Sequence, residues 1–453
     1  MSAAESIASF GCSIKEADIG ALVLETCGRA LVDTFAGAIA GWKEDATQLA
    51  LRYARQSGSP GSAGVASCWG NAEPLPLELA ALCNGVASHA LDFDDLSPVM
   101  RGHPSAAMLP ALVATAESID ASGTQLACAY IVGFEVICKL SKAFGFEHYS
   151  RGWHSSSTIG ILGAALGCAK LLNLNIAETT HAIGLAAAQA GGIQANFGSH
   201  AKPFQIGHSN ASGLRAALLA REGFTASKDA LDGPHGYLAL YANGESVNAH
   251  LGTLGEQPLE IISSGIEVKR YPVCYATHRA IDAVLELRAA EGLQSEDVRT
   301  VHVRAAAGNL APLTHTSPQT GCEATFSMQY AVAAAFIDGH VSLSSFSDAA
   351  VQRTQIQEFM SRVTTDDAGI PTSGTRWSEI HVELSSGKRL SRRVEVLRGS
   401  VKSPLNISEL RGKVADCLNW GGSQVDPSHL VSDSLSFHQT SVRQWLSRAL
   451  HAI

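Results

Sequence analysis

The strongest constraint on the fold is a helical spacing of apolar residues that runs almost unbroken from residue 21 to about 250. Apolar side chains recur there at steps of three and four residues, as helices that bury one face require. Stretches such as GILGAALGCA (160–169) and GLAAAQAGG (184–192) add small residues, which let helix backbones approach closely. No convincing strand is expected in this region, so the sequence predicts tightly packed helices.

The pattern changes near residue 260. Segment 259–272 mixes β-branched residues with a turn, 298–306 alternates as a half-buried strand does, and 379–396 predicts a β-hairpin. Helical stretches are expected at 278–291 and 324–338, and the helical pattern returns from about 405. We therefore predict a mainly α protein, in which a large all-helical domain (1–262 and 400–453) is interrupted by a smaller α+β lid domain (263–399).

Composition and charge exclude several classes of function. The chain has 453 residues, of which 46% are hydrophobic and 17% are charged, enough apolar material for a large core. The net charge is −9 and no basic run occurs, so no nucleic-acid partner is expected. The uncharged stretch 182–199 is broken by polar residues and glycine, so no membrane span is expected either. Ten scattered cysteines without a C-x-x-C pair, and no signal-peptide pattern, predict a cytoplasmic protein with reduced thiols.

Cofactor motifs are missing from the sequence. It contains no H-E-x-x-H, EF-hand loop, grouped Cys/His spacing, P-loop, G-x-S-x-G elbow, or strand followed by G-x-G-x-x-G. The DFDD segment could bind a hard cation, but no second oxygen-rich cluster accompanies it. The sequence therefore predicts neither a metal nor an organic cofactor, and leaves proton transfer by Asp, His, Tyr and Lys.

The first polar loop, 89–110, places Asp92 beside two further aspartates and is followed by Arg101 and His103. A capped helix end would explain some of these residues. Clustered titratable groups also shift one another's pKa, which suits acid–base catalysis. Both interpretations stay open from the sequence.

Two further loops carry polar residues against an apolar background. In 146–160, Tyr149 and His154 precede a serine-rich helix start at Ser155, whose free N–H groups favour an anion. An ordinary N-cap explains the serines but not Tyr149 and His154. In 196–210, Lys202 has few charged neighbours, so it is either a surface lysine or a desolvated base.

A fourth loop, 267–282, lies at the predicted domain junction. Lys269 and Arg270 bring positive charge there, and His278 opens a helix. A solvated helix start is the simpler interpretation of the two basic residues. The position would also let the smaller domain close over a site on the larger one.

Five motifs together resemble the MmgE/PrpD family, in order from about residue 20 to 400. They are HALDFDDLS with GHPSAAMLPAL, WHSSSTIG, AKPFQIGHSN, KRYPVCYATHRA, and EATFSMQYAVAAAFIDG. The resemblance implies a large helical domain, an α+β lid, a homodimer, and no metal or organic cofactor. The positions that match the family's active site are Asp92, His103, His154, Lys202, His278 and Tyr330. Without the resemblance, Tyr330 would be assigned to the core.

Two details favour one branch of that family. Decarboxylase-like members carry Thr directly after DFDD, whereas Leu96 and Ser97 follow here. The DFDDLSPVMRGHPS, HYSRGWH and YPVCYATH segments are more similar to the iminodisuccinate epimerase branch. That likeness implies a lysine and a tyrosine on opposite faces of the substrate carbon, here Lys202 and Tyr149.

We therefore expect an enzyme acting on a small di- or tricarboxylate. Arg101, Lys269 or Arg270, together with the helix start at Ser155, would hold the substrate carboxylates. His278 and Tyr330 would complete the binding site. Lys202 or His103 would remove the proton alpha to a carboxylate, with Asp92 orienting His103. Dehydration or epimerisation would follow. A cis-aconitate-type decarboxylase is the alternative, and a non-catalytic carboxylate-binding protein is the alternative of another class.

Overall fold

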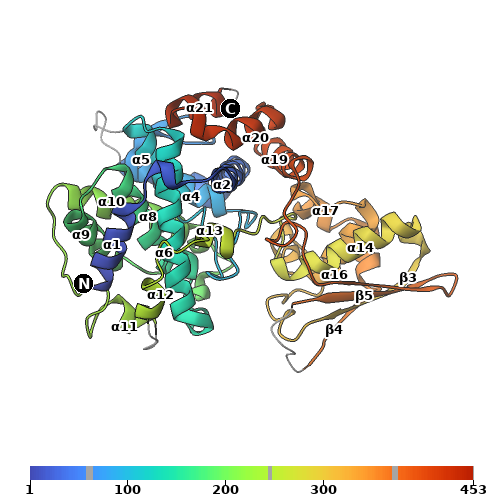
Figure 1. The fold of residues 1–453 in the computed structure, drawn as a ribbon. Helices are drawn as coiled ribbons and strands as arrows, with labels where there is room; N and C mark the ends of the chain where they lie inside the picture. The colour runs from blue at the N-terminus through green and yellow to red at the C-terminus, as the bar shows by residue number, and fades with distance from the viewer. Residues whose placement is uncertain (58–64, 243–246, 370–375, 452–453) are drawn as a thin grey trace. The chain divides into compact units, whose positions relative to one another are not determined.

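The computed structural model describes residues 1–57, 65–242, 247–369 and 376–451. The chain is mainly α, as predicted (Figure 1). It divides into two compact units, one formed by Met1–Glu267 with Leu410–Ile453 and the other by Val268–Glu409. The sequence-based boundaries lie at 262/263 and 399/400.

The first unit is a bundle around the long helix α6 (Gly123–Ser150), which packs on α8 (Gly160–Leu171). Ser122 caps α6, and its side chain accepts a hydrogen bond from the Gln125 N–H. The other helices before the second unit are α1 (Ala3–Ser13), α2 (Ala21–Gly41), α3 (Asp45–Ser57), α4 (Leu77–His89), α5 (Leu109–Ser118), α7 (Ser155–Thr158), α9 (Ile176–Ala187), α10 (Ala201–Arg221), α11 (Tyr237–Tyr241), α12 (Val247–Leu251) and α13 (Glu260–Ser263). After it come α19 (Ile407–Gly421), α20 (Pro427–Leu435) and α21 (Val442–Leu450).

Glycines bring α4 and α10 into backbone contact, at positions outside the two small-residue stretches of the sequence. A Cβ built on Gly85 would lie 2.8 Å from the Gly207 Cα. One built on Gly207 would lie 2.5 Å from the Leu82 carbonyl oxygen. Larger side chains do not fit at either position. The two helices that flank the candidate site therefore pack with no side chain between them at this point.

One local prediction for this unit is wrong, because strands are present where none was expected. In a two-stranded antiparallel sheet, β1 (Val65–Ser67) pairs with β2 (Pro74–Pro76). Its three-residue strands are too short to give a period-2 pattern. Segment 259–272, where β-branched residues mix with a turn, contains the short helix α13, and Glu267 forms an isolated bridge with Leu96.

The second unit packs helices on one face of a four-stranded sheet with order β4-β3-β5-β6. β3 (Val298–Ala305) pairs parallel with β4 (Val363–Asp367) and antiparallel with β5 (Ser378–Leu384), and β5 pairs antiparallel with β6 (Arg389–Val394). Ile380 and Val382 point to the core, whereas His381 between them is exposed. The strand at 298–306 and the hairpin are thus confirmed.

Helix α14 (His278–Glu291) packs on β5 and β6, and α16 (Met328–Asp338) packs on α14 (Figure 1). Both match predicted helical stretches, although α16 begins four residues after the predicted start at 324. The remaining helices of this unit are α15 (Gly321–Ala324), α17 (Asp348–Val351) and α18 (Thr354–Met360). Within the described ranges, no helix has both the length and the apolar character needed to cross a bilayer.

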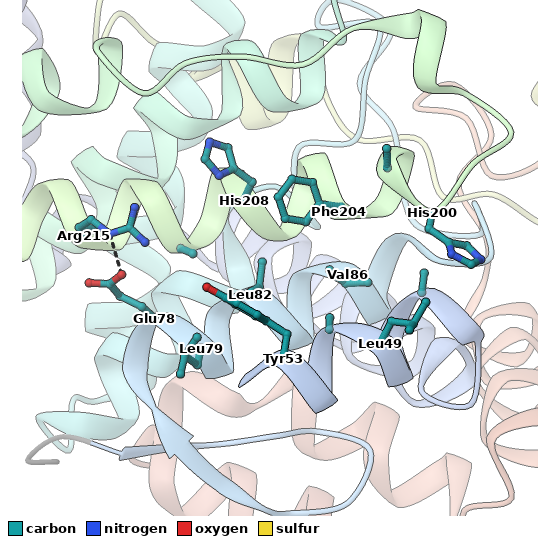
Figure 2. Close-up of a pocket in the computed structure, with 14 residues that line it drawn as sticks. Leu49, Tyr53, Glu78, Leu79, Leu82, Val86, His200, Phe204, His208 and Arg215 are labelled. Carbon is teal, nitrogen blue, oxygen red and sulfur yellow. Dashed lines mark hydrogen bonds and ion pairs between the residues drawn. The ribbon is translucent and has the colours of Figure 1, made fainter. Parts of the chain in front are cut away.

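The first unit also carries an apolar groove of about 600 Å³ between α3, α4 and α10 (Figure 2). Leu49 and Tyr53 line it from α3, and Phe204 lines it from α10. These three side chains are 43%, 58% and 49% exposed. At one end of the groove, Arg215 Nε donates to Glu78 Oε2 at 2.7 Å. The groove is therefore an exposed apolar surface with an ion pair at its end.

Candidate active site

The loop that follows α4 supplies the acidic residues of the candidate site. His89 is the last residue of α4, and Asp92 then adopts a positive φ of 52°, a conformation that is uncommon for residues other than glycine. Backbone hydrogen bonds in both directions join Leu96 to Glu267 (2.9 and 2.8 Å) and fix the far end of the loop. The loop therefore has a fixed, unusual backbone that directs its side chains.

Asp94 lies between two histidines. Its two oxygens each lie 3.0 Å from His89 Nδ1, and Oδ2 lies 3.1 Å from His103 Nδ1. Burial lowers the pKa of His89 to about 4, so His89 is neutral near pH 7. Burial alone would raise the pKa of Asp94, but its interactions with His103 and His89, including a hydrogen bond to each, lower it well below its usual range. Asp94 is therefore an ionised carboxylate that orients both imidazoles.

His103 has a carboxylate near each ring nitrogen. Its Nε2 lies 3.4 Å from Asp92 Oδ1, while Nδ1 faces Asp94. Its backbone N–H donates to Ser156 Oγ at 2.9 Å, which ties the loop to α7. Both ring nitrogens of His103 therefore face carboxylate oxygens, so either nitrogen can donate a hydrogen bond to a carboxylate.

Lys202 lies in the first turn of α10, because this helix starts at residue 201, within the segment 196–210 that was predicted as a loop. Its Nζ lies 2.9 Å from Asp92 Oδ1, and its side chain is only 16% exposed. The ammonium also lies 5.5 Å from the centre of the Phe197 ring. Lys202 is thus a largely buried ion-paired cation and not a solvated surface lysine. Asp92 joins it to His103.

His154 approaches the same cluster from the start of α7. Its Nδ1 lies 2.7 Å from Gln205 Oε1, and its ring centre lies 6.0 Å from that of His89. Gln205 Nε2 donates to the Ile193 carbonyl, so the amide oxygen faces the histidine. His154 then carries its proton on Nδ1 and leaves Nε2 with a lone pair. Burial, with the neighbouring charges, lowers the pKa of His154 well below its usual range.

The serines that follow His154 hold the site together. Ser155 is buried in the first turn of α7, while Ser156 Oγ accepts from His103 and Ser157 Oγ donates to the Gln205 carbonyl at 3.0 Å. His154 stands at the N-cap position without a side-chain cap bond. The serine run is therefore more than an ordinary N-cap. The use of Ser155 for substrate binding stays a prediction.

Arg101 and Tyr149 are two further residues that the sequence predicts for the site. Arg101 is exposed, has a φ of 52°, and places its guanidinium 4.0 Å from the centre of the Phe146 ring. Tyr149 is half-buried near the end of α6, where its carbonyl accepts from Gln194 Nε2 at 2.6 Å. Their proposed roles, in carboxylate binding and proton transfer, stay predictions.

Four predicted site residues belong to the second unit. Lys269 is buried, and Arg270 Nη1 lies 3.2 Å from Asp282 Oδ1. His278 is fully buried, with Nε2 at 3.2 Å from the Val273 carbonyl oxygen. The Tyr330 hydroxyl donates to the Ser345 carbonyl, and burial raises the pKa of Tyr330 to about 12. Tyr330 thus has the surroundings of a core residue, and the functions of all four stay predictions.

Four side chains of the cluster could together hold a metal ion. His89, Asp92, Asp94 and His103 each offer one ligand atom, and these atoms lie within 4.8 Å of one another. Imidazole and carboxylate are ordinary ligands for divalent transition metals. The Lys202 ammonium, 2.9 Å from Asp92, would repel such a cation. The residues therefore fit an acid–base cluster better than a metal centre.

Sequence reasoning missed His89 and Gln205. His89 stands one turn before the DFDD segment, so a histidine at a helix end beside an acidic loop was a usable signal. Gln205 gave no signal, because a glutamine in a helix is ordinary and its partner His154 is 51 positions away. Of the predicted residues, the structure brings together Asp92, His103, His154 and Lys202.

Known proteins resemble the chain over most of its length. The family model of the MmgE/PrpD N-terminal domain matches residues 5–250, and that of the C-terminal domain matches residues 271–431. A human cis-aconitate decarboxylase is 30% identical, covering 91% of this chain and 88% of that protein. The mouse cis-aconitate decarboxylase is 28% identical (86% and 81%), as is one from Aspergillus terreus (86% and 83%).

Proposed function

This chain belongs to the MmgE/PrpD family, and we propose that it is an enzyme that forms a carbanion beside a carboxylate of a small di- or tricarboxylate and then protonates it. One observation carries the proposal. The ammonium of Lys202, the carboxylate of Asp92 and the imidazole of His103 are in direct contact, beside the neutral His154. A cation and a neutral base are the two groups that carbanion formation needs.

His154 is the base that the surroundings favour. Gln205 Oε1 accepts a hydrogen bond from the Nδ1–H of His154, and the lowered pKa keeps the lone pair on Nε2 available near pH 7. His154 would remove the proton from the carbon next to a carboxylate. The electron pair of the broken C–H bond would move into that carboxylate and form an enediolate.

Lys202 and His103 would then supply positive charge and a proton. The Lys202 ammonium would stabilise the enediolate, because a fixed cation in a buried site acts with little screening. His103, held between Asp92 and Asp94, would donate a proton to a leaving hydroxyl or back to carbon. Loss of a β-hydroxyl gives dehydration. Protonation of the opposite face, with Tyr149 as donor, gives epimerisation.

Decarboxylation is the second candidate, because the decarboxylases described above are similar over more than four-fifths of this chain. In that reaction the bond between carbon and a carboxylate breaks, its electron pair stays on carbon, and CO₂ leaves. Lys202 or His103 would protonate the carbanion. Leu96 and Ser97, which stand where decarboxylase-like members carry Thr, favour the first candidate.

Substrate turnover in D₂O tests the proposal. Methylcitrate, cis-aconitate and iminodisuccinate would each be incubated with the enzyme and followed by proton NMR. We expect one acid to be converted, with deuterium at the carbon next to its carboxylate. Binding without turnover or exchange would instead support the non-catalytic carboxylate-binding protein.

The family resemblance and the apolar groove also support a homodimer. In a two-fold dimer, the same surface of each protomer faces its copy, which would cover Leu49, Tyr53 and Phe204 together. Light scattering after size exclusion would give the mass of a dimer for the wild type. Leu49→Glu would give the mass of a monomer, and an unchanged dimer would place the interface elsewhere.

A further inference from the structure

We infer that Lys413, paired with Asp33, is a positioning residue that holds the loop of Asp92 and Asp94 in its working shape. This inference rests on the proposed function, because it assigns Lys413 to the same site. Lys413 does not belong to the cluster itself. It lies in α19 and contacts the loop through a hydrogen bond to the backbone carbonyl of Phe93.

The contacts converge on one residue of the loop. Lys413 Nζ donates to the Phe93 carbonyl oxygen at 2.8 Å and lies 2.5 Å from Asp33 Oδ1. The ammonium also lies 4.2 Å from the centre of the Phe93 ring. Phe93 stands between Asp92 and Asp94, so Lys413 binds the loop directly between its two functional carboxylates.

Burial gives these contacts their strength. The side chains of Lys413 and Asp33 are 3% and 0% exposed. A buried ammonium must have a partner charge and hydrogen-bond acceptors, because water does not reach it. Asp33 supplies the charge and Phe93 supplies a carbonyl oxygen. Lys413 is therefore fixed in place from both sides.

A second buried carboxyl group, that of Asp95, lies in the same loop as Phe93. Asp95 is fully buried, and its carboxylate accepts from Ser105 Oγ, which is 2.6 Å from the Tyr130 hydroxyl oxygen. Burial, together with the charge of Asp33, raises the pKa of Asp95 well above its usual range. The charge of Asp33 therefore acts on the loop at Asp95, while Lys413 contacts the loop at Phe93.

The backbone of Asp92 explains why the loop needs such support. Its φ of 52° is disfavoured for a residue with a Cβ, and such conformations persist when surrounding contacts hold them. Without the bond from Lys413 to Phe93, the loop could relax to an ordinary backbone. Asp92 would then lose its positions 2.9 Å from Lys202 and 3.4 Å from His103.

A paired substitution separates positioning from simple stabilisation. Lys413→Met alone leaves Asp33 buried without its counter-charge and is expected to lower the melting temperature. The double variant Asp33→Asn with Lys413→Met removes both charges, so its melting temperature is expected to return toward that of the wild type. Lys170→Met is the matched control, because Lys170 Nζ also donates to a backbone carbonyl, that of Ile14 at 2.5 Å, but not in this loop.

Two measurements on the folded double variant decide the question. Hydrogen exchange of peptides covering 90–104 is expected to be faster by on the order of tenfold than in the wild type or in Lys170→Met. With the acid that the wild type converts, kcat is expected to fall by on the order of tenfold while KM changes little. The single variant Asp33→Asn, which keeps the donor to Phe93, is expected to retain more activity than the double variant.

The outcomes separate this inference from the proposed function. Wild-type exchange and wild-type kcat in the double variant would overturn the role of Lys413. If the wild type converts none of the acids, the proposed function fails, while the exchange comparison still decides whether Lys413 holds the loop.

Discussion

Gln205 Oε1 lies 2.7 Å from His154 Nδ1, so one amide determines which nitrogen of a buried imidazole carries the proton. Replacing Gln205 by Glu would put a carboxylate at this position and raise the pKa of His154. If neutral His154 is the base, the acidic limb of kcat/KM against pH is expected to move to higher pH. Gln205→Leu removes the acceptor and is expected to lower kcat without that rise. The same acidic limb in both variants would remove His154 as the base.

Lys202 is predicted to stabilise the carbanion by its charge. Lys202→Ala is expected to lower kcat by a factor on the order of 10² to 10³ and to suppress exchange of the substrate hydrogen in D₂O, because the enediolate loses its cation. Lys202→Arg keeps the charge and is expected to retain more of the exchange. Lys170→Met controls for general loss of a lysine. Undiminished exchange in Lys202→Ala would exclude this role.

Arg101 is predicted to bind a substrate carboxylate. Arg101→Gln is expected to raise KM about tenfold with a smaller effect on kcat, because it removes a binding contact that the ground state and transition state share. Steady-state kinetics would measure both constants. Arg151, also exposed and only a few residues from Phe146, provides the control variant Arg151→Gln. Equal KM values for the two variants would assign the carboxylate to another residue.

His278 is predicted to contribute to the reaction from the second unit. His278→Gln is expected to lower kcat/KM by a factor on the order of ten to a hundred if this unit acts as a lid over the site. Because His278 is buried, the melting temperature of the His278→Gln variant must also be compared with that of the wild type. His302→Gln, in the half-exposed outer row of the sheet, serves as control. Wild-type kinetics in a folded His278→Gln protein would argue against the lid.

Acid is predicted to destabilise the first unit through His148. Burial lowers the pKa of His148 to about 4, against about 6.5 in the unfolded chain, so between these values only the unfolded state binds the proton. Stability should therefore fall as the pH drops from 6.5 to 4, by roughly 1.4 kcal/mol per pH unit for each such histidine. Urea unfolding of His148→Gln is expected to show a shallower fall. The exposed His340→Gln should match the wild type.

The helices were predictable because burial repeats along them at helical spacing. The helical spacing predicted between residues 21 and about 250 corresponds to helices such as α4 and α9, and the hairpin at 379–396 corresponds to β5 and β6. The strands of β1 and β2 were not predictable, because three residues carry no period. The start of α10 was missed because glycine and proline around 198–203 are typical of a loop.

Local sequence also shows which loops are polar, but not which atoms meet. Asp92, His103, His154 and Lys202 could be selected because charged or titratable residues stand out in an apolar chain. The pairing of Lys413 with Asp33 could not be selected, because 380 positions separate them and each lies in an ordinary helix. Such a pair is created by packing alone. The pattern predicts the members of a site better than the contacts that hold it.

The glycine contact between α4 and α10 has a consequence for how this enzyme can change. His89 ends one helix and Lys202 lies in the first turn of the other, and the spacing of the two helices is fixed where Gly85 meets Gly207. No side-chain rotamer can accommodate a shift at that crossing. Even a methyl group added at either glycine would push the two helices apart and displace the reacting groups that they carry. A change of substrate specificity is therefore expected to come from substitutions in the loops around the site, and not from substitutions where α4 and α10 cross.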